Sequence, residues 1–147
     1  MIISILNTLV SGMTSSTDKF TFGYGADWFA NLDLDEATFP VVYLDQPVTN
    51  DYQLTAGNYI GEVYPITLFF MYKSELDYTP QQHDVNCITP ANNAIRQFIS
   101  VCQDSELIDE VSDASGNEFT NLLDVNVSGK SLSITLKPRI NASACIQ

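Results

Sequence analysis

The chain has 147 residues, of which 45% are hydrophobic and 11% aromatic, and this length and composition are typical of one folded domain. Eighteen acidic residues against six basic ones give a formal net charge of −12. The few Lys and Arg residues are mostly far apart, whereas gripping nucleic acid requires them in clusters, so we do not expect a DNA-binding protein.

The N-terminal segment MIISILNTLVSGM carries no positive region and no small-x-small cleavage site, so we expect no signal peptide. No apolar stretch approaches the roughly 20 residues that span a bilayer. Cys87, Cys102 and Cys145 form no C-x-x-C pair, and we expect buried thiols rather than disulfides or zinc ligands. The chain is therefore expected to be made in the cytoplasm, without a membrane partner.

The first predicted element is a short amphipathic helix. Its apolar residues recur at helical spacing: Ile2, Ile5, Leu6, Leu9, Val10 and Met13. The opposite face is neutral, as the core of a protein contact tends to be.

Three predicted strands follow this helix. Alternation of Phe20, Phe22 and Tyr24 predicts the first, and FPVVYL at 39–44 the second. A polar bridge at 48–58 indicates a loop or hairpin tip. Residues 59–76 form the longest candidate, and their apolar centre is typical of an interior strand buried on both faces.

Two of these strands carry an aromatic-proline pair, FPVVYL and YPITLFF. Proline has no N–H for a sheet, and the start of a strand is where this loss costs least. We therefore expect Pro40 and Pro65 to lie at the first positions of their strands. We expect partners to bind at the loops that precede these strands, with Trp28 before the first and Tyr52 to Asn58 before the second.

A helix is predicted from Thr79, as its N-cap, through Cys102, with Pro80 in the first turn. Its predicted buried stripe comprises Val85, Ile88, Ile95, Phe98, Ile99 and Cys102. Pro90 predicts a kink, or a restart with Thr89 as a second cap.

The C-terminal part returns to strand periodicity, and we expect a hairpin of 118–127 and 131–138 around an SGK turn, with a possible short strand at 107–112. The predicted fold class is α+β, a mostly antiparallel sheet of about five to six strands with two helices packed on one side. Residues 1–147 are expected to form one domain, with a core at 1–137 and a C-terminal extension at 138–147.

Three features of the sequence bear on whether the chain has a nucleotide site, a metal site or a catalytic base. SGKS at 128–131 lacks the upstream glycine and the helix of a phosphate loop, so we expect no nucleotide site. NLDLDE at 31–36 lacks the glycine and the final Glu of an EF-hand, which favours a solvated acidic loop. Weak calcium binding across a subunit contact, through Asn31, Asp33 and Asp35, stays open. His83 is expected to be a solvent-facing residue near a helix start rather than a catalytic base.

Taken in order, several segments resemble the small tail-completion proteins of tailed bacteriophages, and among them the tail-terminator family. They are FTFGYGADWF, FPVVYLDQP, YPITLFFMYKSELDYTPQQ, IRQFISVC and LLDVNVSGKSLSITL. The resemblance covers about residues 1–137, and the chain departs from it at Pro90 and at the tail RINASACIQ.

The resemblance implies a structural virion protein that forms a homo-oligomeric ring at the head–tail junction, neck or tail, without catalysis or cofactor. It further implies contacts with itself and with other neck or tail proteins, and assembly in the host cytoplasm before incorporation into the virion. DNA would pass through the lumen unbound, since an acidic wall repels phosphate. Such a ring needs head-to-tail contacts that close.

Six residues are our candidates for the assembly interface: Ile2, Leu6, Trp28, Asp33, Asp35 and Tyr52. Trp is enriched at binding hot spots, although a loop tryptophan folded onto the core fits Trp28 equally well. One alternative is a monomeric binding or regulatory module with a pocket among Tyr24, Trp28 and Tyr43. The other is an enzyme that uses His83 with nearby carboxylates.

Overall fold

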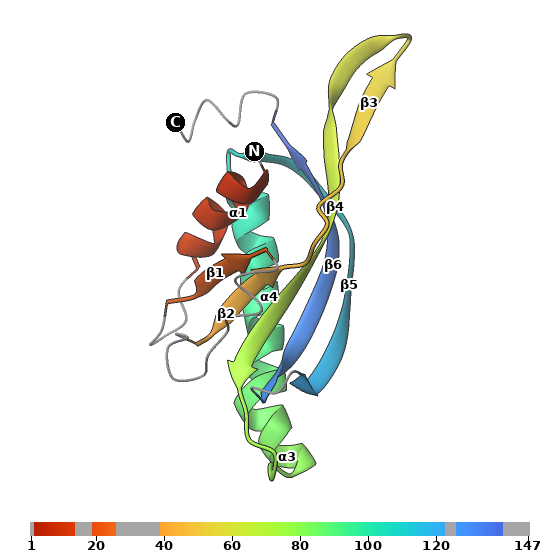
Figure 1. The fold of residues 1–147 in the computed structure, drawn as a ribbon. Coiled ribbons are helices and arrows are strands. Elements are labelled where there is room, and N and C mark those ends of the chain that lie inside the picture. The colour runs from red at the N-terminus through yellow and green to blue at the C-terminus, as the bar shows by residue number, and fades with distance from the viewer. Residues whose placement is uncertain (1, 14–18, 26–38, 123–125, 140–147) are drawn as a thin grey trace.

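The computed structural model describes residues 2–13, 19–25, 39–122 and 126–139 (Figure 1). Its helices are α1 (Ile2–Ser11), α3 (Pro80–His83), the π-helical turn η1 (Asp84–Ile88) and α4 (Thr89–Asp104). Its strands are β1 (Thr21–Tyr24), β2 (Val41–Leu44), β3 (Asp51–Thr55), β4 (Asn58–Lys73), β5 (Ile108–Leu122) and β6 (Val127–Pro138).

The six strands form one sheet with the order β1-β2-β4-β6-β5, and β3 pairs with the first part of β4. The β1–β2 pair is parallel and all other pairs are antiparallel. Two helices, α1 and α4, pack against the sheet (Figure 1). The predicted α+β class is confirmed, with one parallel pair that makes the sheet mixed.

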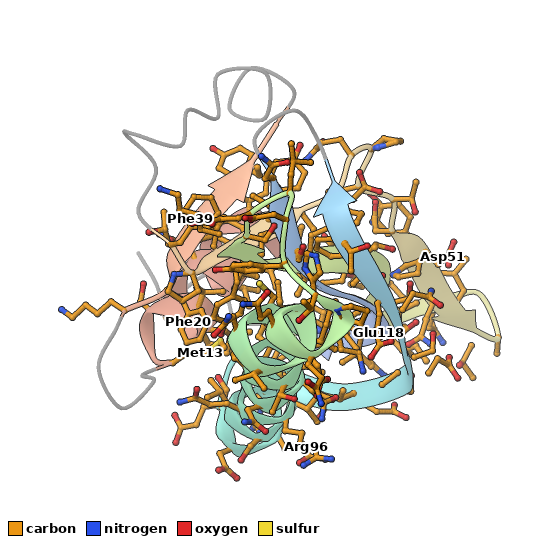
Figure 2. The ribbon with its side chains drawn as sticks, turned by 90° about the horizontal axis from the view of Figure 1, so that it is seen from below. Met13, Phe20, Phe39, Asp51, Arg96 and Glu118 are labelled. Atoms are coloured by element: carbon orange, nitrogen blue, oxygen red, sulfur yellow. The ribbon has the colours of Figure 1, made fainter. Side chains whose placement is uncertain are left out.

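The main core lies between the two helices and one face of the sheet. Its fully buried members include Ile5 and Leu6 from α1, Phe98 from α4, and Leu68, Phe70 and Leu136 from the sheet. The rings of Phe70 and Phe98 meet edge to face, with centroids 6.0 Å apart. Arg96 lies on the side of α4 away from the sheet (Figure 2).

A second, smaller apolar cluster lies on the opposite face of the sheet. Its members are Val41, Tyr43, Met71 and Val127, with Phe39, Phe69 and Phe119 packed against them. The centre of β4 is therefore buried on both faces, as its continuous apolar run predicts.

Pro40 directly precedes β2, as expected, but Pro65 is the eighth residue of the 16-residue strand β4. The expectation that Pro65 opens its strand is therefore wrong. The strand is longer than predicted because the polar bridge before it turns back as β3 and pairs with residues 58–63.

Pro65 is tolerated in mid-strand because no described strand pairs with β4 at this position on the side to which its backbone nitrogen points. Pairing with β3 ends at Val63 and pairing with β2 begins at Leu68. The carbonyl of Thr67 accepts a bond from the Asp45 N–H on that side, at 2.9 Å. Because residues two apart direct their backbone groups to the same side of a strand, the missing N–H of Pro65 falls in the unpaired interval.

The long helical segment begins as predicted, since Thr79 forms a reciprocal capping box with Gln82. Pro90 has no N–H, and the helix accommodates it with the π-helical turn η1, in which the Thr89 N–H bonds to the Asp84 carbonyl. The helix is therefore continuous, and Thr89 is not a second cap. The extra residue in the turn shifts the buried stripe, and Val85 is 68% exposed rather than buried.

The C-terminal hairpin is present, but its turn was placed wrongly. Residues 108–112 and 118–122 belong to the single strand β5, and the SGK segment lies inside β6. Gly129 is needed there because a Cβ would collide with the carbonyl oxygen of Phe70 in β4. This glycine marks a close approach of two backbones rather than a turn.

Candidate functional site: a projecting hairpin arm

Residues 51–63 form a two-stranded hairpin, hereafter the arm, that projects beyond the body of the molecule (Figure 1). Within the described part of the chain, β3 packs closely against no element other than β4. A two-stranded hairpin by itself is at best marginally stable in water. The arm therefore receives little packing from the rest of the described subunit.

The local sequence explains why the chain turns back here. Ala56 and Gly57 both have positive φ, at 52° and 80°, as a two-residue hairpin turn with the right twist requires. A register shift follows between Gln53 and Leu54, where β4 has one extra residue, and Gly61 adopts a φ of 149° beside it. The predicted hairpin tip is confirmed and is flanked by longer strands than the polar bridge suggested.

The arm exposes large apolar side chains to an unusual degree. The exposed fraction is 66% for Tyr52, 64% for Leu54, 53% for Tyr59 and 41% for Ile60. No charged residue occurs between positions 52 and 61, although the chain as a whole carries a charge of −12. Apolar side chains in an uncharged stretch are typical of the centre of a protein contact.

These side chains continue a face of the sheet that is covered elsewhere. Glu62 and Tyr64 alternate in phase with the core residue Ile66, so they share the helix-covered face of β4. Tyr52 lies opposite Glu62, and Leu54 lies opposite Tyr59, which puts them on that same face. The helices cover this face in the body, whereas along the arm none of the described elements covers it.

Glu62 organises the base of the arm. Its carboxylate accepts hydrogen bonds from the hydroxyl of Tyr59 at 3.0 Å and from that of Tyr64 at 2.8 Å. Burial, followed by the hydrogen bond to Glu62, raises the pKa of Tyr64 well above its ordinary value of 10.0. The pKa of Tyr59 is raised for the same reasons. The carboxylate thus holds the hydroxyls of both rings.

The predicted interface residues have different positions in the structure. Tyr52 lies exposed on the arm, but Ile2 and Leu6 are 4% and 0% exposed and belong to the main core. Their inclusion as contact residues is therefore corrected, since an amphipathic helix buries its apolar face in its own subunit. Trp28, Asp33 and Asp35, and with them the acidic loop, lie outside the described residues.

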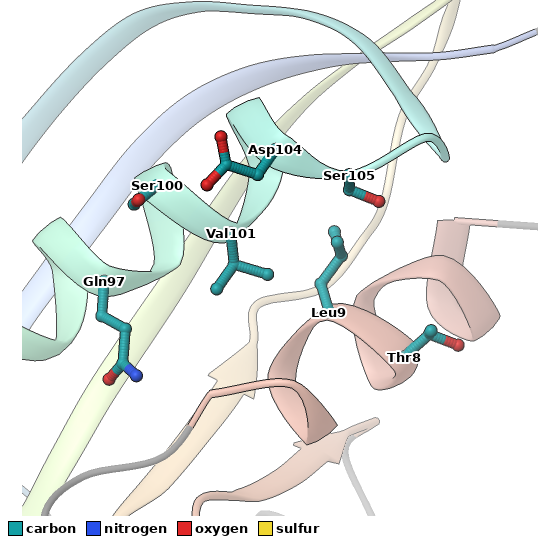
Figure 3. Close-up of a pocket in the computed structure, with 7 residues that line it drawn as sticks. All are labelled: Thr8, Leu9, Gln97, Ser100, Val101, Asp104 and Ser105. Carbon is teal, nitrogen blue, oxygen red and sulfur yellow. The ribbon is translucent and has the colours of Figure 1, made fainter.

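A cleft of about 550 Å³ lies between α1 and the second half of α4 (Figure 3). Its lining residues are Thr8, Leu9, Gln97, Ser100, Val101, Asp104 and Ser105. Leu9 and Val101 point toward each other across it, and Asp104 is its one charged residue (Figure 3). The side chains of Tyr24 and Tyr43, suggested as a pocket, do not line this cleft. Tyr43 is 4% exposed, and its hydroxyl donates to the carbonyl of Gly25 at 3.1 Å.

His83 is buried, at 8% exposure, so its predicted solvent-facing position is wrong. The hydroxyl of Ser128 donates to Ser74 Oγ at 3.0 Å, and Ser74 donates to the carbonyl of Asn126 at 2.8 Å. Ser128 has no second proton, so at the 3.3 Å contact His83 Nδ1–H is the donor. This direction is opposite to that of a histidine that deprotonates a serine, and Ser128 is 0% exposed. The geometry favours a structural role for the three residues.

Two cysteines, Cys87 and Cys102, lie fully buried as free thiols, as predicted. Burial raises the pKa of Cys87 to about 11 and that of Cys102 to about 12. Among the described residues, no three His, Cys, Asp or Glu side chains are grouped closely enough to hold a metal ion. None of the described helices combines the length and apolarity that crossing a membrane requires.

Sequence reasoning identified Tyr52 and the stretch 52–58 that contains Leu54, and it missed Tyr59 and Ile60. They were missed because Gly, Asn and Thr among them made the segment resemble a loop. The available signal was the alternation of Tyr52 and Leu54 before a turn, in the longest charge-free part of the polar bridge. No family model matches this sequence, and a search of curated proteins found no match.

Proposed function

We propose that this chain is a structural virion protein of a tailed phage, a subunit of a homo-oligomeric ring at the head–tail junction or tail. The observation that carries the assembly part of this proposal is the arm, with its uncovered apolar face and its uncharged stretch at 52–61. The phage part rests on the sequence resemblance to tail-completion and tail-terminator proteins. In this role the chain carries no catalytic site and needs no cofactor.

The arm supports a role in assembly because a protein that acts alone gains nothing from exposing it. Four of the seven large hydrophobic side chains that are exposed in the described residues lie on this one hairpin. Burying each of them removes apolar surface from water, at about 25 cal/mol per Å². Contact with another protein would therefore stabilise both the arm and the assembly.

The charge of the chain suits a ring around DNA. With 18 acidic and 6 basic residues, the subunit repels phosphate and would not hold a passing strand. Two copies would also repel each other, unless they meet through surfaces without charge. Residues 52–61 of the arm form such a surface, and other neck or tail proteins are further partners in this proposal.

The test is the solution mass of the full chain across a concentration series, compared with two matched variants. Leu54→Glu places a charge on the arm, and Leu76→Glu makes the same change at a residue that is 76% exposed outside the arm. We expect the wild type and Leu76→Glu to associate and Leu54→Glu to stay monomeric, all three with the same circular dichroism. A wild type that stays monomeric, alone and with tail or neck proteins, would favour the monomeric binding module instead.

The proposal that this is a phage protein needs a separate test, because the solution mass of the chain does not bear on it. Portal, capsid or tail genes beside the gene for this chain would support it. Genes of metabolism in those positions would contradict it, whatever the oligomeric state.

A further inference from the structure

We propose that the arm of one subunit lies in the cleft between α1 and α4 of the next subunit. This inference rests on the proposed ring and names the surface that receives the arm. It makes the contact heterologous, because two different surfaces of the same chain meet. The occupant of the cleft is thus a second copy of this chain.

The first step concerns what the arm lacks. Along the body of the sheet, the face that carries Ile66, Leu68 and Phe70 is covered by α1 and α4. Along the arm, the same face carries Tyr52, Leu54 and Tyr59, and no other described element covers it. In the body, apolar side chains of α1 and α4 cover this face, so an apolar surface on a neighbouring subunit is a suitable cover for the arm.

The second step concerns the receiving surface. The outward residues of α1 are small and uncharged: Ser4, Asn7, Thr8 and Ser11. Beside them, Leu9 and Val101 form an apolar floor between the two helices (Figure 3). Ring side chains fit such a floor, and tyrosine adds a hydroxyl that can bond at the polar rim.

The third step is electrostatic. Two subunits of charge −12 approach most easily through surfaces that carry little charge. The arm has none between positions 52 and 61, and the cleft has only Asp104. A tyrosine hydroxyl from the arm would donate to that carboxylate, which satisfies both groups.

The two surfaces cannot meet within one subunit. The arm, formed by β3 and the first part of β4, extends beyond the helices (Figure 1). The cleft lies between α1 and α4 on the helix layer (Figure 3). A contact between them must join two copies. Because the donor and acceptor surfaces differ, an open row of subunits retains one free arm at one end and one free cleft at the other until the ring closes.

Disulfide trapping between two differently tagged subunits tests the contact, since a bridge forms only where two Cα atoms approach within about 7 Å. One subunit carries Leu54→Cys on the arm, and the other carries Thr8→Cys or Ser100→Cys on the two rims of the cleft. Both are full chains with Cys145→Ser, and the buried Cys87 and Cys102 stay unreactive because burial raises the pKa of their thiols. Asn117→Cys, exposed on β5, is the control position.

We expect a mixed disulfide between the arm and at least one rim, at a yield about tenfold above that with Asn117→Cys. We also expect Thr8→Glu and Ser100→Glu to weaken association about tenfold or more, as the loss of an interface anchor does, while Asn117→Glu leaves it unchanged. Arm-to-arm bridges alone, or equal yields at all positions, in a chain that associates would overturn the inference and leave the ring standing. A chain that never associates would overturn both.

Discussion

Tyr64 donates its hydroxyl to the carboxylate of Glu62 at 2.8 Å, and this contact joins the core of the sheet to the base of the arm. Tyr64 is 8% exposed and packs in the main core, whereas Glu62 belongs to the arm and also accepts from Tyr59. The carboxylate thereby links a side chain of the core to one of the arm, along the continuous strand β4 that carries the arm away from the body. An arm with a fixed direction loses less conformational entropy when it binds.

This contact predicts a fall in stability at alkaline pH. The pKa of Tyr64 is higher in the folded chain than its ordinary value of 10.0, so above pH 10 the unfolded chain releases a proton that the folded chain retains. The contribution of Tyr64 to the free energy of unfolding should be constant below about pH 9 and should decrease above pH 10. Tyr64→Phe should cost about 1 kcal/mol at neutral pH and reduce the alkaline decrease.

Urea unfolding of the wild type and Tyr64→Phe at several pH values measures both effects. The buried thiols contribute in the same direction, because the pKa values of Cys87 and Cys102 are also raised. The comparison with the variant isolates the part due to Tyr64. Identical pH profiles for the two proteins would show that the Tyr64 hydroxyl is not held as described.

The buried chain of bonds through Ser128 predicts a structural effect. Ser128→Ala removes the acceptor for His83 and the donor for Ser74, and it leaves both buried groups without that partner. We expect a loss of about 1–3 kcal/mol in the free energy of unfolding. Ser131→Ala, on the same strand but half-buried, is the control and should cost under about 0.5 kcal/mol. Chemical denaturation checks both, and equal costs would refute the special role of the network.

Gly129 predicts a strong steric effect. In Gly129→Ala the new methyl would meet the backbone carbonyl of Phe70, which cannot move without separating β4 from β6. We expect a destabilisation of about 3 kcal/mol or more. Gly12→Ala is the control, because its Cβ would be 3.4 Å from the nearest atom, an ordinary contact. Thermal denaturation measures both, and a Gly129→Ala protein as stable as the control would contradict the close approach of the strands.

The prediction for Trp28 comes from the sequence, since this residue lies outside the described part of the chain. If Trp28 is an assembly anchor, Trp28→Ala should keep its circular dichroism spectrum and lose association by about 2 kcal/mol or more, the loss typical of a hot spot. Equilibrium sedimentation measures the association. Equal loss of fold and association would show that Trp28 packs in the core.

The sequence predicted the fold class because periodicity reports burial directly. The spacing from Ile2 to Met13 predicted α1, and the apolar run at 66–71 predicted an interior strand. The prediction from sequence failed where one local pattern is compatible with two different structures. Gly129 has the appearance of a turn residue, but it lies inside β6, two residues beyond the Val127 that pairs with Leu122, and it serves a tertiary contact that no local rule reveals.

The candidate site was predicted only in part, again because a local pattern does not show what the residue contacts in the fold. Tyr52 was selected because it precedes a turn, but the partner strand of the arm was read as part of the next long strand. Ile2 and Leu6 were selected for a neutral helix, although helical periodicity itself puts apolar residues inside and Ser4 and Thr8 outside. Which face of a helix meets a partner depends on what the same subunit already covers.

Electron microscopy of the associated full chain tests the central claim most directly, because it shows how the subunits are arranged. The account predicts closed rings of one size with a central opening, and their absence in Leu54→Glu but not in Leu76→Glu. Particles with the mass of one chain at every concentration, alone and with tail or neck proteins, would contradict it.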